Sequence, residues 1–170
     1  MARYAALLRA VNVGGTGKLP MADLKRMGEE AGFEAVSTYI ASGNLIFRSD
    51  HGESAVRKAL EDKLEAYAGK RVAVHVRTAE ELAALVERNP FPECPPNRVV
   101  AMLIEGAPPA DTLDRVSGRQ EEEIALGVRE IFIHYGDGQA DSKLRIPAAA
   151  GGTGRNMNTI AKLAQLTAKL

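Results

Sequence analysis

The sequence predicts an α+β fold made of two ferredoxin-like halves, each with helices on one face of an antiparallel sheet. Three observations lead to this prediction. Strand and helix patterns follow the order β-α-β-β-α-β, short breaks suit hairpins between neighbouring strands, and a similar order begins again after a proline-rich stretch. The halves are expected at 1–77 and 98–170, joined by a helix and a proline-rich linker at 78–97. A doubly wound parallel sheet is the competing fold, and the two hairpins argue against it.

The first half begins with a strand and a helix. Residues 3–11 are small and apolar and stop at Asn12, which is typical of a buried strand. Pro20 in a first turn and apolar residues at spacings of three predict a helix over 19–31, which Gly32 can end. The same rules predict a hairpin of strands 36–42 and 45–48 that turns at Ser42-Gly43-Asn44, a helix over 53–67 stopped by Gly69, and a strand of alternating valines over 72–76.

A helix and a proline-rich run lead into the second half. Thr78 and Glu81 have the spacing of a capping box, which predicts a helix through Arg88, and the proline-rich run 89–97 then breaks the chain. The second half is expected to hold a strand over 98–104, a short helix near 110–117, strands over 123–128 and 130–135, mostly loop over 136–152, and a closing helix over about 153–169.

Composition limits the classes of function. The 170 residues contain 22 basic and 22 acidic residues, so the molecule has no long-range field that would collect polyanions or anionic lipid, and an anion site must be local. The chain has one cysteine, Cys94, and no apolar run near the roughly 20 residues of a membrane-spanning helix. Its first residues do not resemble a secretion signal. We expect a cytoplasmic protein with no membrane segment.

A glycine-rich basic loop between a strand and a helix, residues 9–21, is the first candidate site. A phosphate-binding Walker loop is excluded because Asn12 and Leu19 stand where it needs a glycine and a hydroxyl, and Pro20 breaks the dinucleotide fingerprint. A generic nest of backbone N–H groups beside Lys18 remains, as either a plain connection or an anion cradle. Arg9, inside the predicted strand, needs a partner, which is an internal carboxylate or a bound anion.

The second candidate site is the glycine-rich segment 151–159. Thr153 is expected to cap the last helix, with Arg155 and Asn156 in its first turn. A cation there opposes the helix dipole, and an anion bridging Arg155 and the helix N–H groups would reverse that penalty. Capping alone is the other interpretation. Asn44 in the hairpin is expected to supply a left-handed turn conformation, with ligand contact as the alternative.

Other chemistry finds little support in the residue pattern. The three histidines are scattered without neighbours at ligand spacing, so no metal site is predicted. No cofactor motif and no Ser-His-Asp arrangement is present, and Ser42 lacks a nucleophile elbow. The sequence therefore contains no catalytic constellation.

Three stretches of the chain carry a resemblance to a known family. They are 7–15 with 20–24, 39–47, and 153–159 with Lys162 and Leu163. Through them the chain resembles the uncharacterised, mainly bacterial family catalogued as domain of unknown function 1697, which often has glycine at the position of Ala10. The resemblance covers nearly the whole chain and implies two ferredoxin-like subdomains, but it implies no activity. Its motif positions form a candidate ligand site, to which we add Lys18: Arg9, Asn12, Gly14, Gly15, Ser42, Gly43, Asn44, Arg155 and Asn156.

Several functions are compatible with these patterns. The leading hypothesis is a module that binds a small phosphate- or carboxylate-bearing ligand through Arg9, Lys18 and Arg155. RNA binding is the second, prompted by the ferredoxin-like order; it is weakened by balanced charge and by having only Tyr39 and Phe47 placed for stacking. An enzyme using Lys18 or Ser42 lacks a general base. A structural or protein-interaction role, in which the motifs only shape turns, is the remaining alternative.

Overall fold

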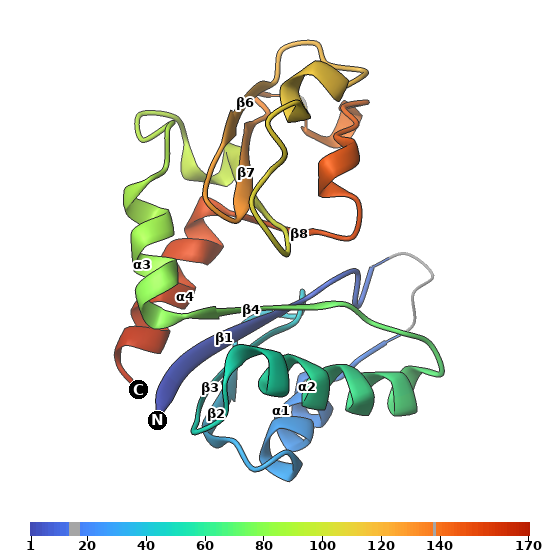
Figure 1. The fold of residues 1–170 in the computed structure, drawn as a ribbon, viewed down its shortest axis with the longest axis vertical. Coiled ribbons are helices and arrows are strands. Elements are labelled where there is room, and N and C mark those ends of the chain that lie inside the picture. Colours follow the sequence, from blue (N-terminus) through green and yellow to red (C-terminus); the bar gives the residue numbers. More distant parts are fainter. Residues whose placement is uncertain (14–17, 138) are drawn as a thin grey trace. The chain divides into compact units, whose positions relative to one another are not determined.

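The computed structural model describes residues 1–13, 18–137 and 139–170, and it divides into two compact units (Figure 1). Unit 1 comprises Met1–Ala83 and Leu163–Leu170, and unit 2 comprises Ala84–Lys162. Each unit contains a four-stranded antiparallel sheet. The predicted α+β class with two antiparallel sheets is confirmed, and the arrangement is consistent with two ferredoxin-like halves.

Unit 1 has the strand order β2-β3-β1-β4, and both neighbours of β1 in the sheet, β3 and β4, run antiparallel to it. Helices α1 and α2 lie on the same face of this sheet (Figure 1). The elements are β1 (Ala2–Leu8), α1 (Met21–Glu30), β2 (Glu34–Thr38), β3 (Asn44–Ser49), α2 (Glu53–Ala68), β4 (Val74–Thr78) and α3 (Ala79–Glu87), which continues into unit 2.

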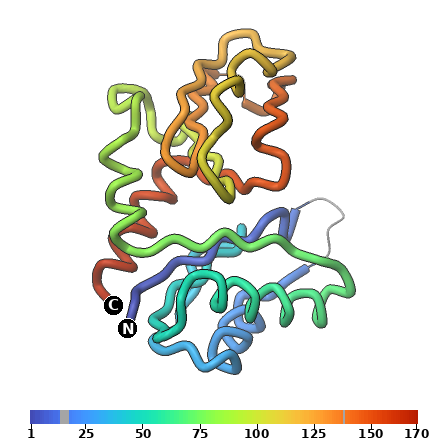
Figure 2. Tube along the Cα trace, in the orientation of Figure 1, coloured from blue at the N-terminus to red at the C-terminus, as the bar shows by residue number. Residues whose placement is uncertain are grey.

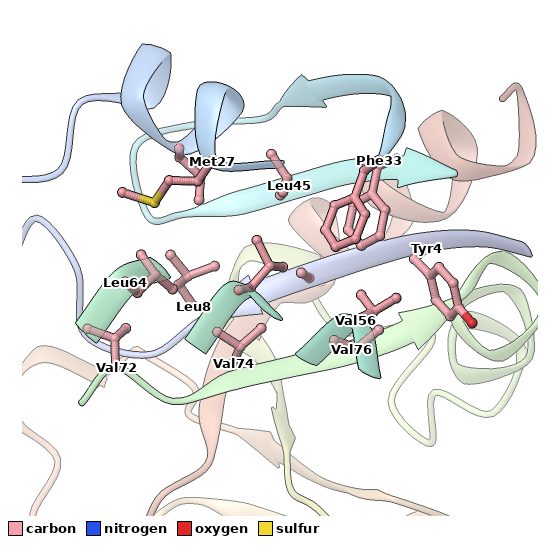
Figure 3. Close-up of a cluster of buried hydrophobic side chains, with 14 of the residues drawn as sticks. Tyr4, Leu8, Met27, Phe33, Leu45, Val56, Leu64, Val72, Val74 and Val76 are labelled. Atoms are coloured by element: carbon pink, nitrogen blue, oxygen red, sulfur yellow. The ribbon is translucent and has the colours of Figure 1, made fainter. Parts of the chain in front are cut away.

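The core of unit 1 forms between the sheet and its two helices because alternate strand residues face the helices. Leu8, Phe47 and Leu60 are fully buried there, and Figure 3 shows part of this cluster. Phe33 stacks on Phe47 with ring centroids 4.2 Å apart and an interplanar angle of 9°. Burial of two aromatic rings and many branched side chains supplies most of the stabilisation of this unit.

Two predicted helix boundaries in unit 1 are confirmed by their hydrogen bonds. Gly69 ends α2 in the left-handed conformation at φ 72°, as a C-terminal glycine does. Thr78 and Glu81 form the predicted capping box: the Glu81 amide donates to Thr78 Oγ1 at 3.1 Å, and the Thr78 amide donates to Glu81 Oε1 at 3.0 Å.

The ends of the chain meet in unit 1, as the trace in Figure 2 shows. Arg3 on β1 donates to the carbonyl oxygen of Ala168 at 2.8 Å and pairs with Glu80 at 2.7 Å. The pairing with Arg3 and its hydrogen bond lower the pKa of Glu80. The last turn of the chain is therefore part of unit 1 and not a free tail.

Unit 2 repeats the strand connectivity of unit 1, because its sheet order β6-β7-β5-β8 matches β2-β3-β1-β4 position by position. Its connections are shorter. A predicted helix near 110–117 is a single 3-10 turn, Thr112–Arg115, since Ser117 leaves the turn to pair with Arg145 in an isolated bridge. The elements are β5 (Val99–Leu103), β6 (Glu123–Leu126), β7 (Glu130–His134), β8 (Thr153–Asn156) and the first half of α4 (Met157–Ala168), which continues into unit 1 at Leu163.

The predicted start of the closing helix at Thr153 is wrong. Residues Thr153–Asn156 form strand β8 beside β5, and α4 begins only at Met157. The side chain that caps α4 is Asn156, whose Oδ1 accepts from the Thr159 amide at 3.0 Å. The local sequence favours a helix capped by Thr153. The four residues instead form backbone hydrogen bonds along the open edge of β5, and this partner is distant in the sequence.

Ser142, in the segment between β7 and β8, contacts the carboxylate of Glu122, which is 5% exposed. Glu122 accepts from the Ser142 hydroxyl and from the Gln120 amide at 2.6 Å, and these hydrogen bonds, led by that of Ser142, lower its pKa. A carboxyl whose pKa is lower when folded stabilises the protein above its unfolded pKa, and this contribution is lost as pH falls through the folded pKa.

We therefore expect Ser142→Ala to reduce the loss of stability in mild acid. The wild type should lose thermal stability steadily as pH falls below about 4.5, while the variant, starting lower at pH 7, should lose less over the same interval. Thermal unfolding at steps between pH 7 and pH 3 measures both slopes. Equal slopes for the two proteins would show that the Ser142 hydroxyl does not set the protonation of Glu122.

Candidate functional site

A pocket of about 280 Å³ lies in unit 1, between the ends of the glycine-rich segment and the last turn of α2. Lys18 and Lys70 carry the charge among the described residues that line it, and no described lining residue is acidic. The remaining lining is apolar apart from one tyrosine: Ala10, Val11, Leu19, Leu64, Tyr67, Ala68 and Val72. The arrangement suits a ligand with an apolar body and a negative end.

Each wall of the pocket has a defined structural origin. Leu64 and Val72 belong to the buried core, so the floor of the pocket is apolar. Tyr67 forms a partly exposed wall, and its hydroxyl donates to Asp23 Oδ2 on α1 at 3.3 Å. Asp23 also pairs with Arg26 at 2.6 Å. The Asp23 carboxylate is therefore occupied on α1, and its charge is offset by Arg26.

Sheet pairing brings the two sides of the pocket together. The amide of Arg9, just after β1, donates to the carbonyl oxygen of Ala73, just before β4, at 3.0 Å. Sequence reasoning missed Tyr67 and Lys70, because it placed them at and just after the end of a helix 49 and 52 positions after Lys18. A basic residue directly after the helix-stopping Gly69 was the one available signal.

Arg9 and Asn12 differ in exposure and in their contacts. Strand β1 ends at Leu8 and the Arg9 side chain is exposed, so the expected cost of burying its guanidinium does not arise. Asn12 is half-buried and hydrogen-bonds to the backbone of Leu19 and Ala41. Gly14 and Gly15, two further predicted site residues, lie outside the described residues.

The predicted site residues of the hairpin have structural roles that the contacts explain. Asn44 is fully buried and its Nδ2 donates to the Tyr39 carbonyl oxygen at 2.9 Å and to Ser42 Oγ at 3.2 Å. The left-handed residues of this turn are Ile40 at φ 53° and Gly43 at φ 94°, so the expected left-handed role of Asn44 is wrong. A Cβ on Gly43 would lie 2.6 Å from Val11 Cγ2, which explains the glycine.

Arg155 and Asn156 lie on β8 in unit 2. Arg155 is 8% exposed and donates to Thr153 Oγ1 at 2.9 Å and to the Gly154 carbonyl oxygen at 3.0 Å. Burial lowers its pKa from 12.5 to about 10, so it remains a cation at neutral pH. Asn156 caps α4. Arg9 belongs to unit 1 and Arg155 to unit 2, and their convergence on one ligand stays a prediction.

Alternative sites are not supported by the described residues. Phe47, one of two aromatic residues that an RNA-stacking surface would use, is fully buried against Phe33 and offers no ring face to a base. No group of three His, Cys, Asp or Glu side chains able to hold a metal ion occurs within the described ranges. Among the described helices, none has the length and hydropathy needed to cross a bilayer.

Comparison with known proteins gives a family and a fold relative. Residues 1–132 match the model of the family described as "Protein of unknown function (DUF1697)". The chain is also similar to a solved structure, "The structure of conserved bacterial protein SP0830 from Streptococcus pneumoniae", with 25% identity, 98% of each chain covered and a TM-score of 0.80. No curated protein matched. Because the family model spans well over half of the residues, the chain belongs to the DUF1697 family of proteins of unknown function.

Proposed function

We propose that unit 1 binds a compact organic anion, one with a carboxylate or phosphate on a short apolar body, in the pocket between Lys18 and Lys70. The observation that carries this proposal is the charge of the pocket: its charged lining residues within the described chain are both lysines, while the rest of the lining is mostly apolar. The volume of about 280 Å³ is at the small end of ligand pockets, which points to a small molecule.

The two parts of the pocket contribute in different ways to binding. Each methylene group that leaves water for the apolar floor contributes about 0.8 kcal/mol. Lys18 and Lys70 are exposed at the rim, so each ion pair contributes about 0.7 kcal/mol and weakens with added salt. An anion without an apolar body would lose the first contribution, and a neutral molecule with the same body would lose the second.

The last turn of α2 provides a competing role for the lysines. The carbonyl groups at a helix C-terminus carry partial negative charge, and a nearby cation stabilises the helix. Tyr67 and Ala68 of this turn line the pocket together with Lys70. If helix stabilisation is the whole role of the lysines, removing their charge will lower thermal stability and change no ligand affinity.

The test uses hexanoate, hexan-1-ol and inorganic phosphate as probes of the full chain, with dissociation constants from NMR titration. Wild-type protein should bind hexanoate more tightly than either other probe. Lys18→Gln combined with Lys70→Gln keeps the apolar stems and removes both charges, so hexanoate should bind about tenfold more weakly, since two rim contacts sum to about 1.4 kcal/mol.

A matched control is Lys25→Gln, an exposed lysine on α1 that does not line the pocket. It removes one positive charge from the same unit and should leave the hexanoate affinity unchanged. Absence of hexanoate binding to the wild type, or equal affinity in the wild type and the double variant, would contradict the proposed function.

A further inference from the structure

We infer that Asn12 is a positioning residue for this anion site: its side chain fixes the backbone of Leu19 and so places the neighbouring Lys18 at the pocket. This inference rests on the proposed function, because it assigns Asn12 a task in ligand binding in addition to a task in folding. It is carried by three hydrogen bonds from one side chain and by the conformation of the backbone around it.

The side chain of Asn12 binds Leu19 as a neighbouring strand would. Its Oδ1 accepts from the Leu19 amide at 2.6 Å, and its Nδ2 donates to the Leu19 carbonyl oxygen at 2.9 Å. Both backbone groups of one residue are thereby fixed by a side chain seven positions away. Leu19 is 6% exposed and lines the pocket beside Lys18. Fixing the backbone of Leu19 therefore fixes where the Lys18 side chain begins.

A third hydrogen bond links Asn12 to the hairpin. Asn12 Nδ2 donates to the Ala41 carbonyl oxygen at 2.8 Å, in the turn between β2 and β3. Both Nδ2 hydrogens and the Oδ1 atom are thus in use, which accounts for the whole bonding capacity of the amide apart from one lone pair. An aspartate could not donate, and a leucine could neither donate nor accept.

The backbone at this corner is held in an unfavourable conformation. Asn12 has φ 55°. Ala10, two residues before it, has φ 54°, and Ile40, next to the Ala41 that Asn12 contacts, has φ 53°. Asparagine tolerates this region, whereas alanine and especially isoleucine do not. Such conformations persist only where surrounding contacts determine them, and they gather at ligand clamps. Asn12 contributes three side-chain hydrogen bonds at this corner, beside those that Asn44 makes to Tyr39 and Leu8 makes to Gly43.

The consequence for binding is preorganisation. With the backbone of Leu19 fixed, the Lys18 ammonium group meets a ligand from a restricted set of positions, and less freedom is lost on binding. Without these hydrogen bonds, Lys18 retains its charge but not its position. Removing Asn12 should therefore weaken anion binding by about as much as removing the charge of Lys18, and the two losses should overlap.

The experiment is a double-mutant cycle on the full chain, with hexanoate as the probe. Asn12→Gly keeps access to the left-handed backbone and removes all three hydrogen bonds. We expect about a threefold rise in the hexanoate dissociation constant for Asn12→Gly, about the same for Lys18→Gln, and little further rise when the two are combined. Ile40→Gly is the matched control, since Ile40 also has a left-handed backbone but does not line the pocket and is not a hydrogen-bond partner of Asn12, and it should leave the affinity unchanged.

The outcomes separate the inference from the proposed function. Wild-type protein that binds hexanoate, with unchanged affinity in Asn12→Gly, would overturn the role of Asn12 and leave the proposed function standing. Fully additive losses of about ninefold in the combined variant would also overturn it, because they would make Asn12 independent of Lys18. No hexanoate binding by the wild type would remove the proposed function and this inference together. Should Asn12→Gly fail to fold by circular dichroism, Asn12→Ser, which also removes the amide, takes its place in the same cycle.

Discussion

Replacing Arg88 by methionine is expected to lower the free energy of unfolding of unit 2 by about 3 kcal/mol, because it leaves a buried carboxylate without its cation. Glu130 on β7 is 1% exposed, and its Oε1 pairs with the guanidinium of Arg88, directly after α3. Its other oxygen accepts from the Arg129 amide at 2.6 Å. Methionine keeps the apolar volume of the arginine stem, so the loss reports the missing charge.

A second substitution tests whether the unpaired, buried charge of Glu130 is the cause. Glu130→Gln removes the negative charge and keeps the shape, so Arg88→Met should cost about 1 kcal/mol or less when made in the Glu130→Gln background. Native-state hydrogen exchange of the β7 amides measures the free energy for unit 2 in all four proteins. Equal penalties for Arg88→Met in both backgrounds would show that packing, and not the ion pair, explains the effect.

Replacing Gly118 by alanine is expected to destabilise unit 2 by about 3 kcal/mol, from strain and two lost hydrogen bonds. Gly118 has φ 69°, and a Cβ there would overlap with the carbonyl oxygen of Lys143. The adjacent residues Ser117 and Arg145 exchange backbone hydrogen bonds of 3.0 and 2.8 Å. The overlap involves backbone on both sides, so no side-chain rotation can relieve it and the bridge must open.

Gly136 offers a matched control for Gly118. It has a similar left-handed backbone, φ 62°, but nothing lies within 4 Å of the position its Cβ would take. Gly136→Ala should therefore cost only about 1 kcal/mol, the price of the conformation alone. Hydrogen exchange of the Ser117 and Arg145 amides, together with thermal unfolding, measures both variants. An equal loss in the two would place the whole effect in backbone conformation and none in the contact with Lys143.

Both predictions concern unit 2, where buried carboxylates and an isolated backbone bridge contact the loops. Its connections contain 3-10 turns where unit 1 has α1 and α2. One apolar cluster there consists of Ile104, Ile131, Ile133 and Ile146, with partly buried residues against it. The carboxylates of Glu122 and Glu130 accept hydrogen bonds from the loop amides of Gln120 and Arg129.

The candidate site shows which residue roles are visible in a sequence. Lys18 was predicted as a site residue because a basic side chain beside glycines at the start of a helix is a pattern within a few residues that favours anion binding. Asn44, Gly43 and Asn12 could be named from their motifs, but their structural tasks depend on the segments that face them: Nδ2 of Asn12 reaches Ala41, and Gly43 leaves room for Val11. Lys70 and Tyr67 could not be named, because only the pairing of β1 with β4 brings them to Lys18.

The fold class, the helices of unit 1, the capping box at Thr78 and the helix stop at Gly69 were determined by the sequence alone, because hydrophobic periodicity and caps act over a few residues. The tertiary structure alone decided that Thr153–Asn156 is a strand, that the 110–117 segment keeps one turn, and that the pocket lies between Lys18 and Lys70. These depend on hydrogen bonds and contacts between residues dozens of positions apart, whose partners no local pattern specifies.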